Sequence, residues 1–271
     1  MDAILSQLQT AENAFQSSDL IAFMLDYPDI PITFTLLYLT LVLYVPQMLQ
    51  DAPPKNLKPA VAMWNLLLTM FSIAGGSVCI PRLLSIVQEQ GFFASLCGAS
   101  KDNYANGRVG FWVAAFLLSK IPELMDTVFL VLQKKDVIFL HWFHHVTVML
   151  YCWHAYIMQP TTGLWFTTMN YFVHSIMYLY YFLTAIGARA LVKPIAPIIT
   201  TLQLVQMVAG IIITVLGLLW TREGRCGADP INSRLGLAMY TSYFVLFALL
   251  FKKLYLSKKP RGTAAGKEKQ V

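Results

Sequence analysis

The sequence predicts an all-α membrane protein with seven transmembrane helices. Hydrophobic residues make up 57% of the 271 residues and charged residues only 13%, with a mean hydropathy of +0.57. A soluble domain of this length is less apolar and more highly charged. Seven apolar stretches also approach or exceed the ~20 residues that a helix needs to cross a bilayer. They lie at Ile32–Leu49, Ala60–Ile80, Phe111–Leu132, Val137–Met158, Leu164–Ile186, Pro194–Trp220 and Leu235–Leu256.

These stretches divide the chain into three parts. Residues 1–31 form a polar, acidic N-terminal segment, residues 32–256 the seven-span domain, and residues 257–271 a basic tail. The N-terminal segment lacks the basic-then-apolar layout of a cleaved signal peptide. Within the first stretch, Pro46 is expected to end or kink the helix.

The basic residues between the stretches predict which way the helices cross the membrane. With the N-terminus on the lumenal side, thirteen Lys and Arg residues fall in cytosolic segments and six in lumenal ones. Cytosolic loops carry the excess of basic residues in membrane proteins. We therefore expect a lumenal N-terminus and a cytosolic C-terminus.

The cysteines and the tail fit this orientation. Cys97 and Cys226 both fall in predicted lumenal loops, where an oxidising compartment favours a disulfide over two unpaired thiols. Near the C-terminus, Lys267 and Lys269 resemble the dilysine retrieval signal of endoplasmic reticulum membrane proteins, although a solvated basic tail would look the same. The sequence thus predicts a multi-pass protein of the endoplasmic reticulum.

Three histidines share one face of the fourth predicted span. His141, His144 and His145 are spaced i, i+3 and i+4 in an otherwise apolar run. Polar groups inside a bilayer are costly unless they are paired or line a polar cavity, and ionisable ones mark functional sites. Three on one face favour a functional site over hydrogen-bonded structural histidines.

Further polar residues follow helical spacing in three other spans. Lys120, Glu123, Asp126 and Thr127 share a face of the third span, where a buried structural ion pair between the first two is the main alternative reading. The remaining candidates, in the fifth and sixth spans, are Asn170, His174, Tyr178, Tyr181, Thr200, Gln203 and Gln206.

Depth along the helices indicates that these groups meet. At a rise of about 1.5 Å per residue, Asp126, His144 and Gln203 lie roughly 9, 10 and 14 Å from the cytosolic ends of their spans. Similar depths in separate helices predict one polar chamber that opens to the cytosol, with an apolar region beyond it.

Four ordered motifs carry a resemblance to the ELO family of very-long-chain fatty acid elongases. They are K-x-x-E-x-x-D-T at 120–127, H-x-x-H-H at 141–145, N-x-x-x-H-x-x-M-Y-x-Y-Y at 170–181 and T-x-x-Q-x-x-Q at 200–206. The residues that flank these motifs resemble those of the family branch that acts on saturated and monounsaturated acyl-CoAs. The resemblance implies six helices ringed around an acyl-CoA tunnel, with the first span outside the ring.

The resemblance also implies an acyltransferase, a 3-ketoacyl-CoA synthase that needs no cofactor or metal. It would condense acyl-CoA with malonyl-CoA through an acyl-imidazole on His144, with His145, His141 and Asp126 setting the charge and tautomer of that ring. His174, with Asn170 and Gln203, would stabilise the malonyl enolate, and Lys120 would attract its carboxylate or hold the helix. Tyr178, Tyr181 and Gln206 would complete the substrate site, and Lys134 and Lys135 would meet the CoA phosphates.

Two other classes of protein remain as alternatives. A di-iron desaturase or hydroxylase uses similar histidine boxes but needs roughly eight histidine ligands, and this chain has five histidines. A seven-span receptor or transporter could also bind a ligand on the polar stripe. The expected partners are the lipid bilayer and the two CoA substrates, with a second copy of the chain and the other enzymes of the elongation cycle as candidates, and no nucleic acid.

Overall fold

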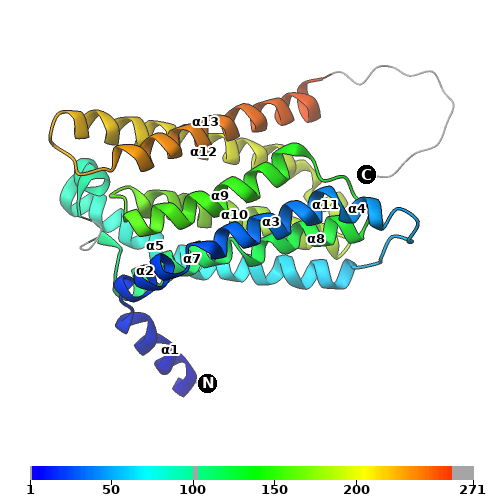
Figure 1. Cartoon of the computed structure of the whole chain (residues 1–271), viewed down its shortest axis with the longest axis horizontal. Helices are drawn as coiled ribbons and strands as arrows, with labels where there is room; N and C mark the ends of the chain where they lie inside the picture. Colours follow the sequence, from blue (N-terminus) through cyan, green and yellow to red (C-terminus); the bar gives the residue numbers. More distant parts are fainter. Residues whose placement is uncertain (1, 100–102, 258–271) are drawn as a thin grey trace.

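A computed structural model describes residues 2–99 and 103–257 of the chain, and this part is built of helices without strands (Figure 1). Lys267 and Lys269, with nearly all of the basic tail, lie outside the described residues. In chain order the helices are α1 (Asp2–Ala14), α2 (Ser17–Asp26), α3 (Asp29–Leu43), α4 (Val45–Met48), α5 (Lys58–Cys97), α7 (Gly107–Ser119), η1 (Pro122–Leu124), α8 (Met125–Leu132), α9 (Phe139–Met158), α10 (Gly163–Ala185), α11 (Arg189–Val192), η2 (Lys193–Ile195), α12 (Ala196–Arg222), α13 (Pro230–Phe251) and η3 (Lys252–Leu256).

Every apolar stretch identified in the sequence falls on helix, but two helices are interrupted by proline. The break between α3 and α4 lies next to Pro46, as expected for a residue that cannot donate a backbone hydrogen bond. Pro122 opens the short 3₁₀ helix η1, which separates α7 from α8. The third stretch is therefore two helices joined by a tight turn rather than one continuous helix.

Three helical segments are long and apolar enough to cross a membrane: Lys58–Cys97, Arg189–Arg222 and Pro230–Leu256. A fourth is possible if α2 and α3, which meet at a bend of 66°, act as one span. Helices α9 and α10 are long enough, but histidine, tyrosine and tryptophan side chains lower their mean hydropathy. These apolar helices make the chain a multi-pass membrane protein.

The long helices pack side by side along one axis of the molecule (Figure 1). Helix α5 packs against α10, and α12 packs against α13. Apolar side chains such as Leu67, Ile73, Val205 and Leu249 are exposed on their outer faces, where lipid would cover them. The helices therefore turn their polar residues inward and their apolar residues outward.

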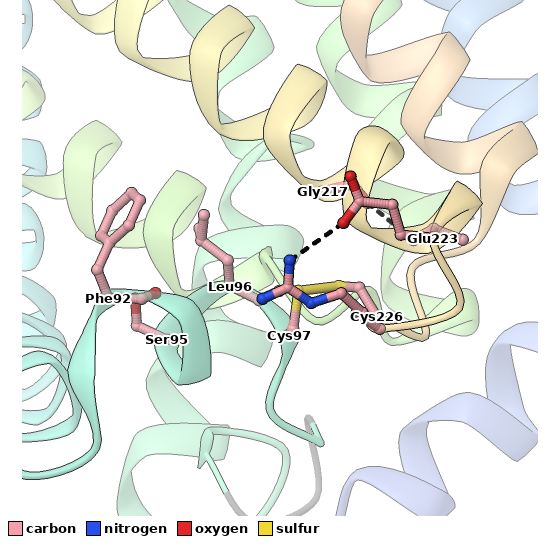
Figure 2. Close-up of a disulfide and its surroundings, with 9 residues drawn as sticks. Phe92, Ser95, Leu96, Cys97, Gly217, Glu223 and Cys226 are labelled. Carbon is pink, nitrogen blue, oxygen red and sulfur yellow. Dashed lines mark hydrogen bonds and ion pairs between the residues drawn. A yellow bond between two sulfur atoms is a disulfide. The ribbon is translucent and has the colours of Figure 1, made fainter.

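A disulfide between Cys97 and Cys226 marks one end of this bundle (Figure 2). It joins the C-terminal end of α5 to the loop that follows α12, across 129 residues of sequence. Arg225 lies over the ring of Phe93 beside it and pairs with Glu223. We call this end of the molecule the disulfide end.

The half of the bundle next to the disulfide end is filled by a hydrophobic core. Leu83, Ile86, Trp153, Leu164 and Tyr171 are among its buried members, contributed by α5, α9 and α10. Close packing there leaves the opposite half of the same helices to form the site described next.

Candidate functional site

A cavity of about 760 Å³ occupies the half of the bundle remote from the disulfide. Its lining comes from α5, η1 and α8, α9, α10, α11, α12, and α13 with η3, whereas α3 lines no part of it. Thirteen of the residues that the sequence analysis selected line the cavity: Glu123, Asp126, Lys135, His141, His144, His145, Asn170, His174, Tyr178, Tyr181, Thr200, Gln203 and Gln206. The structure thus brings together polar groups from helices far apart in sequence.

Two selected lysines, Lys120 and Lys134, do not line the cavity, and their expected contacts with substrate stay predictions. Lys134 donates hydrogen bonds to the backbone oxygens of Leu49 and Gln50, so its ammonium group is turned toward the end of α4. Lys120 is 2% exposed and lies behind Glu123, with its ammonium 4.2 Å from the centre of the Phe116 ring.

Lys120 and Glu123 form a buried ion pair, the alternative that the sequence left open. Lys120 Nζ lies 2.8 and 3.0 Å from the two carboxylate oxygens of Glu123, and Ser119 donates a further hydrogen bond of 2.7 Å. Pairing and hydrogen bonding offset the cost of removing both charges from water. The ion pair joins the end of α7 to η1, and Glu123 presents it to the cavity.

The three box histidines lie in a row on α9. The ring centres of His141 and His145 are 4.6 Å apart, and those of His144 and His145 are 5.4 Å apart. His141 Nε2 is hydrogen-bonded to Thr127 Oγ1 at 2.8 Å. Within the described part of the chain no hydrogen bond engages the ring of His144, which keeps its ring nitrogens available to a ligand.

The backbone of His144 is fixed from α13. Tyr243 Oη donates to the backbone oxygen of His144 at 3.2 Å and lies 2.6 Å from Thr147 Oγ1. The Tyr243 and His144 rings are 5.0 Å apart between centres. A buried tyrosine therefore ties α13 to the turn of α9 that carries the box.

Asp126 is held by donors from two other helices. Trp64 Nε1 on α5 donates to Asp126 Oδ1 at 2.7 Å, and Tyr178 Oη on α10 donates to Oδ2 at 3.1 Å. The carboxyl group makes no hydrogen bond to a histidine among the described residues. It therefore ties α5, α8 and α10 together, and its influence on the tautomer of His144 stays a prediction.

A second histidine centre lies on α10. Asn170 Nδ2 is 3.2 Å from His174 Nε2, one turn apart on the same helix. Gln203 Nε2 on α12 contacts Met177 Sδ at 3.3 Å. Because His174 and His144 line the same cavity from different helices, a bound ligand can contact both.

Basic residues surround the end of the cavity that is farthest from the disulfide. Lys58 at the start of α5, Lys135 after α8 and Arg189 at the start of α11 all line it. Their positive charges favour an anionic ligand at this end, while the histidines lie deeper.

Three aromatic residues that the sequence analysis did not select are part of this arrangement. Trp64 holds Asp126, Tyr243 holds the backbone of His144, and Tyr38 on α3 contacts Thr127 Oγ1 at 2.8 Å. Nothing in the residues around them sets them apart, because aromatic residues are ordinary in membrane helices. Only their partners identify them.

The described residues contain no group of three or more His, Cys, Asp and Glu side chains arranged to hold a metal ion. The polar groups around the cavity come from several helices, and some of them are held by neighbours, as Asp126 is by Trp64 and Tyr178.

Comparison with known proteins agrees with the motifs. The model of the ELO (GNS1/SUR4) family matches residues 23–263. The chain is 46% identical over 280 residues to fatty acid elongase 3 of Trypanosoma brucei brucei, which covers 93% of this chain and 92% of that protein. It is 49% identical over 245 residues to very long chain fatty acid elongase 4 of Trypanosoma cruzi, with 89% and 85% covered. The extent of these matches shows that the chain belongs to the ELO family.

Proposed function

We propose that this protein is a fatty acid elongase that condenses a long-chain acyl-CoA with malonyl-CoA. The product is a 3-ketoacyl-CoA two carbons longer, and carbon dioxide and CoA are released. The observation that carries the proposal is the single cavity lined by His144 and His174 from different helices, with basic residues at one end. The elongase names of the relatives support the same reaction.

The reaction would begin with an acyl transfer to His144. A ring nitrogen attacks the thioester carbonyl, the carbon–sulfur bond breaks, and CoA leaves as a thiolate that takes up the proton of the ring. The absence of a hydrogen bond to this ring among the described residues supports its choice over His141, which is engaged by Thr127. His145 is buried, whereas His144 is only partly buried.

The second half-reaction would join the carbon atoms. Malonyl-CoA loses carbon dioxide, and the resulting enolate carbon attacks the acyl-imidazole carbonyl. The new carbon–carbon bond forms as the carbon–nitrogen bond to His144 breaks, and the released ring takes up a proton from water. An amide nitrogen can only donate, so Asn170 Nδ2 makes Nε2 of His174 the acceptor and leaves the ring proton on Nδ1. His174 would then donate to the enolate oxygen, which is stabilisation of developing charge by a fixed donor.

Neighbouring residues would orient the two substrates. Glu123, Tyr178, Tyr181, Gln203 and Gln206 would contact them from the walls of the cavity. Lys135 and Arg189 would bind the CoA phosphates at its basic end. We expect saturated or monounsaturated acyl groups, because the residues that flank the motifs resemble those of the branch that acts on them.

We further propose seven spans in the endoplasmic reticulum membrane, with the N-terminus lumenal and the C-terminus cytosolic. Six helices, α5 with its successors, would enclose the substrate tunnel, and α3 would lie outside. The lining residues support this division, since they come from those six spans and not from α3. The disulfide at one end of the bundle supports an oxidising lumen on that side. The lysines at the other end support the cytosol on that side.

The test is elongation by the purified full chain with a panel of acyl-CoAs and labelled malonyl-CoA. We expect a labelled product two carbons longer, and an acyl-histidine adduct on His144 in the intact-mass spectrum when malonyl-CoA is omitted. His144→Gln should lower turnover roughly a thousandfold or more, as loss of a nucleophile does. The matched control is His154→Gln, on the same helix but bonded to Asn232 near the other end.

Four results would contradict this reading in different ways. Product formed without any adduct would remove the two-step mechanism but keep the elongase. Full activity of His144→Gln would remove the assigned nucleophile. A wild-type protein that elongates no acyl-CoA would favour a binding protein or transporter. Stoichiometric iron with oxygen-dependent activity would replace the elongase by a di-iron enzyme.

A further inference from the structure

Helix α3 lies outside the cavity but contributes one side chain to the hydrogen bonds behind it. Tyr38 is 2% exposed and packs among Leu124 and Met149. Its hydroxyl is 2.8 Å from Thr127 Oγ1, and its ring centre is 6.1 Å from that of His145. The first predicted span therefore touches the wall that carries the histidine box.

Thr127 passes this contact on to His141. Thr127 is fully buried, and its single hydroxyl lies 2.8 Å from Tyr38 Oη and 2.8 Å from His141 Nε2. One hydroxyl with one proton thus bridges a tyrosine outside the cavity wall and a histidine that lines the cavity. The three groups form a chain that runs from α3 through α8 to α9.

The number of protons in this chain decides its direction. Among the described residues, Thr127 Oγ1 is the only hydrogen-bond partner of the Tyr38 hydroxyl. If Thr127 donated to Tyr38, the proton of the tyrosine would be left without an acceptor in an apolar cluster, which is unfavourable. Tyr38 therefore donates to Thr127, Thr127 donates to His141 Nε2, and the proton of the neutral imidazole resides on Nδ1.

We propose that Tyr38 is a positioning residue that fixes the tautomer of His141 through Thr127. The inference rests on the proposed function only for its effect on turnover. With Nε2 occupied from behind, His141 offers a ligand its protonated Nδ1. It is then a hydrogen-bond donor beside His144 and not a second nucleophile, which suits a group that binds the thioester carbonyl oxygen as charge develops there.

Nitrogen NMR of the full chain labelled with [15N]histidine tests this directly. The signals of His141 are assigned by their loss in His141→Gln. In the wild-type protein we expect Nε2 of His141 to be unprotonated and Nδ1 to carry the proton. In Tyr38→Phe, Thr127 gains a free lone pair and can accept from Nε2–H, so both tautomers should be populated.

Elongation assays supply the second readout. Tyr38→Phe and Thr127→Val should each lower kcat roughly tenfold, the effect of one well-placed hydrogen bond. KM for both CoA substrates should stay within about twofold, since no substrate contact is removed. Thr127→Ser keeps the hydroxyl and should restore both the tautomer and most of the turnover. Thr127→Val is nearly isosteric, so it carries the test if Tyr38→Phe does not fold.

Tyr44→Phe is the matched control. It removes a tyrosine hydroxyl next to the C-terminal end of α3, where Tyr44 is 60% exposed, and should leave the tautomer and kcat unchanged. A protonated Nε2 in the wild type, or an unaltered tautomer in both Tyr38→Phe and Thr127→Val, overturns the inference. So does a rise in KM with kcat unchanged. A tautomer that responds in a protein unable to elongate any acyl-CoA supports the role of Tyr38 and refutes the proposed function.

Discussion

Asp126 shows how single side chains hold the cavity in shape. Its two carboxyl oxygens accept hydrogen bonds from Trp64 on α5 and Tyr178 on α10, so one residue of α8 fixes the distance between three helices. Buried polar groups require such partners, because an unpaired one costs about 1–3 kcal/mol. The indole of Trp64 therefore matters for the position of every group on that wall.

Replacing Trp64 tests this role. Trp64→Phe keeps an aromatic ring but removes the donor, and Asp126 should then shift or recruit water. We expect kcat/KM for elongation to fall roughly tenfold, equivalent to about 1.4 kcal/mol. Steady-state assays with a saturated acyl-CoA measure it.

Trp165→Phe provides the comparison, because that indole donates to Ser95 Oγ at 3.1 Å outside the cavity. It should cost stability but leave kcat/KM close to wild type. Equal losses of activity in both variants would mean that any buried tryptophan has this effect and that the contact with Asp126 is not special.

The residues of the site differ in how far the sequence could identify them. The box histidines, Asn170 and Gln203 were predictable, because polar side chains at helical spacing in apolar stretches are rare. Trp64 and Tyr38 were not, since their role depends on partners 62 and 89 residues away. For Lys134 the sequence predicted a charge near the basic end of the cavity, but not the direction in which the side chain points.

The connection between α8 and α9 separates two adjacent lysines. Lys134 has a backbone φ of 58° and turns its ammonium to the carbonyls that end α4, as cations often do at helix C-termini. Lys135 lines the cavity beside it. Because the chain reverses at this turn, the two neighbouring lysines point in different directions, Lys134 to backbone carbonyls and Lys135 to the cavity.

Replacing Lys134 and Lys135 by alanine, one at a time, should distinguish a structural contact from a substrate contact. Lys135→Ala should raise KM for acyl-CoA roughly fivefold, the effect of one exposed ionic contact worth about 1 kcal/mol, and high salt should reduce the difference. Lys134→Ala should leave KM unchanged and lower the melting temperature slightly. The reverse pattern in assays at low and high salt would show that Lys134 binds the substrate.

The helices themselves were largely predictable, and the departures have local causes. Seven apolar stretches fall on helix because their length and composition admit little else. The break at Pro122 was not foreseen, although the proline was visible, because proline in a membrane helix can also be accommodated as a kink. Helix α5 runs past its apolar stretch to Cys97, with a kink at Gly91, whose φ is 88°.

At the scale of the whole molecule, α5 and α10 join the packed half to the cavity half. Tyr171 lies across Gly75 at their contact and donates to the backbone oxygen of Trp112 at 2.8 Å. The same two helices carry Trp64 and His174 into the cavity. Their separation in the core is therefore expected to set the width of the site as well.

Adding one methyl group at this contact tests the coupling. In Gly75→Ala the new Cβ would overlap the ring of Tyr171, whose hydroxyl is tied down, so the helices must move apart. Overpacking of this kind costs about 1–3 kcal/mol. We expect a lower melting temperature and reduced elongation, although Gly75 itself does not line the cavity.

Gly76→Ala is the neighbouring control, because its Cβ would meet Ile80 Cδ1 at 3.6 Å and Tyr171 Cβ at 3.7 Å, which are ordinary contacts. Removing a helical glycine there should be neutral or stabilise the protein by up to about 1 kcal/mol. Loss of stability in Gly75→Ala with full elongation activity would show that the cavity keeps its geometry independently of the core. Loss of both, with Gly76→Ala unaffected, means that the α5–α10 contact determines fold and site together.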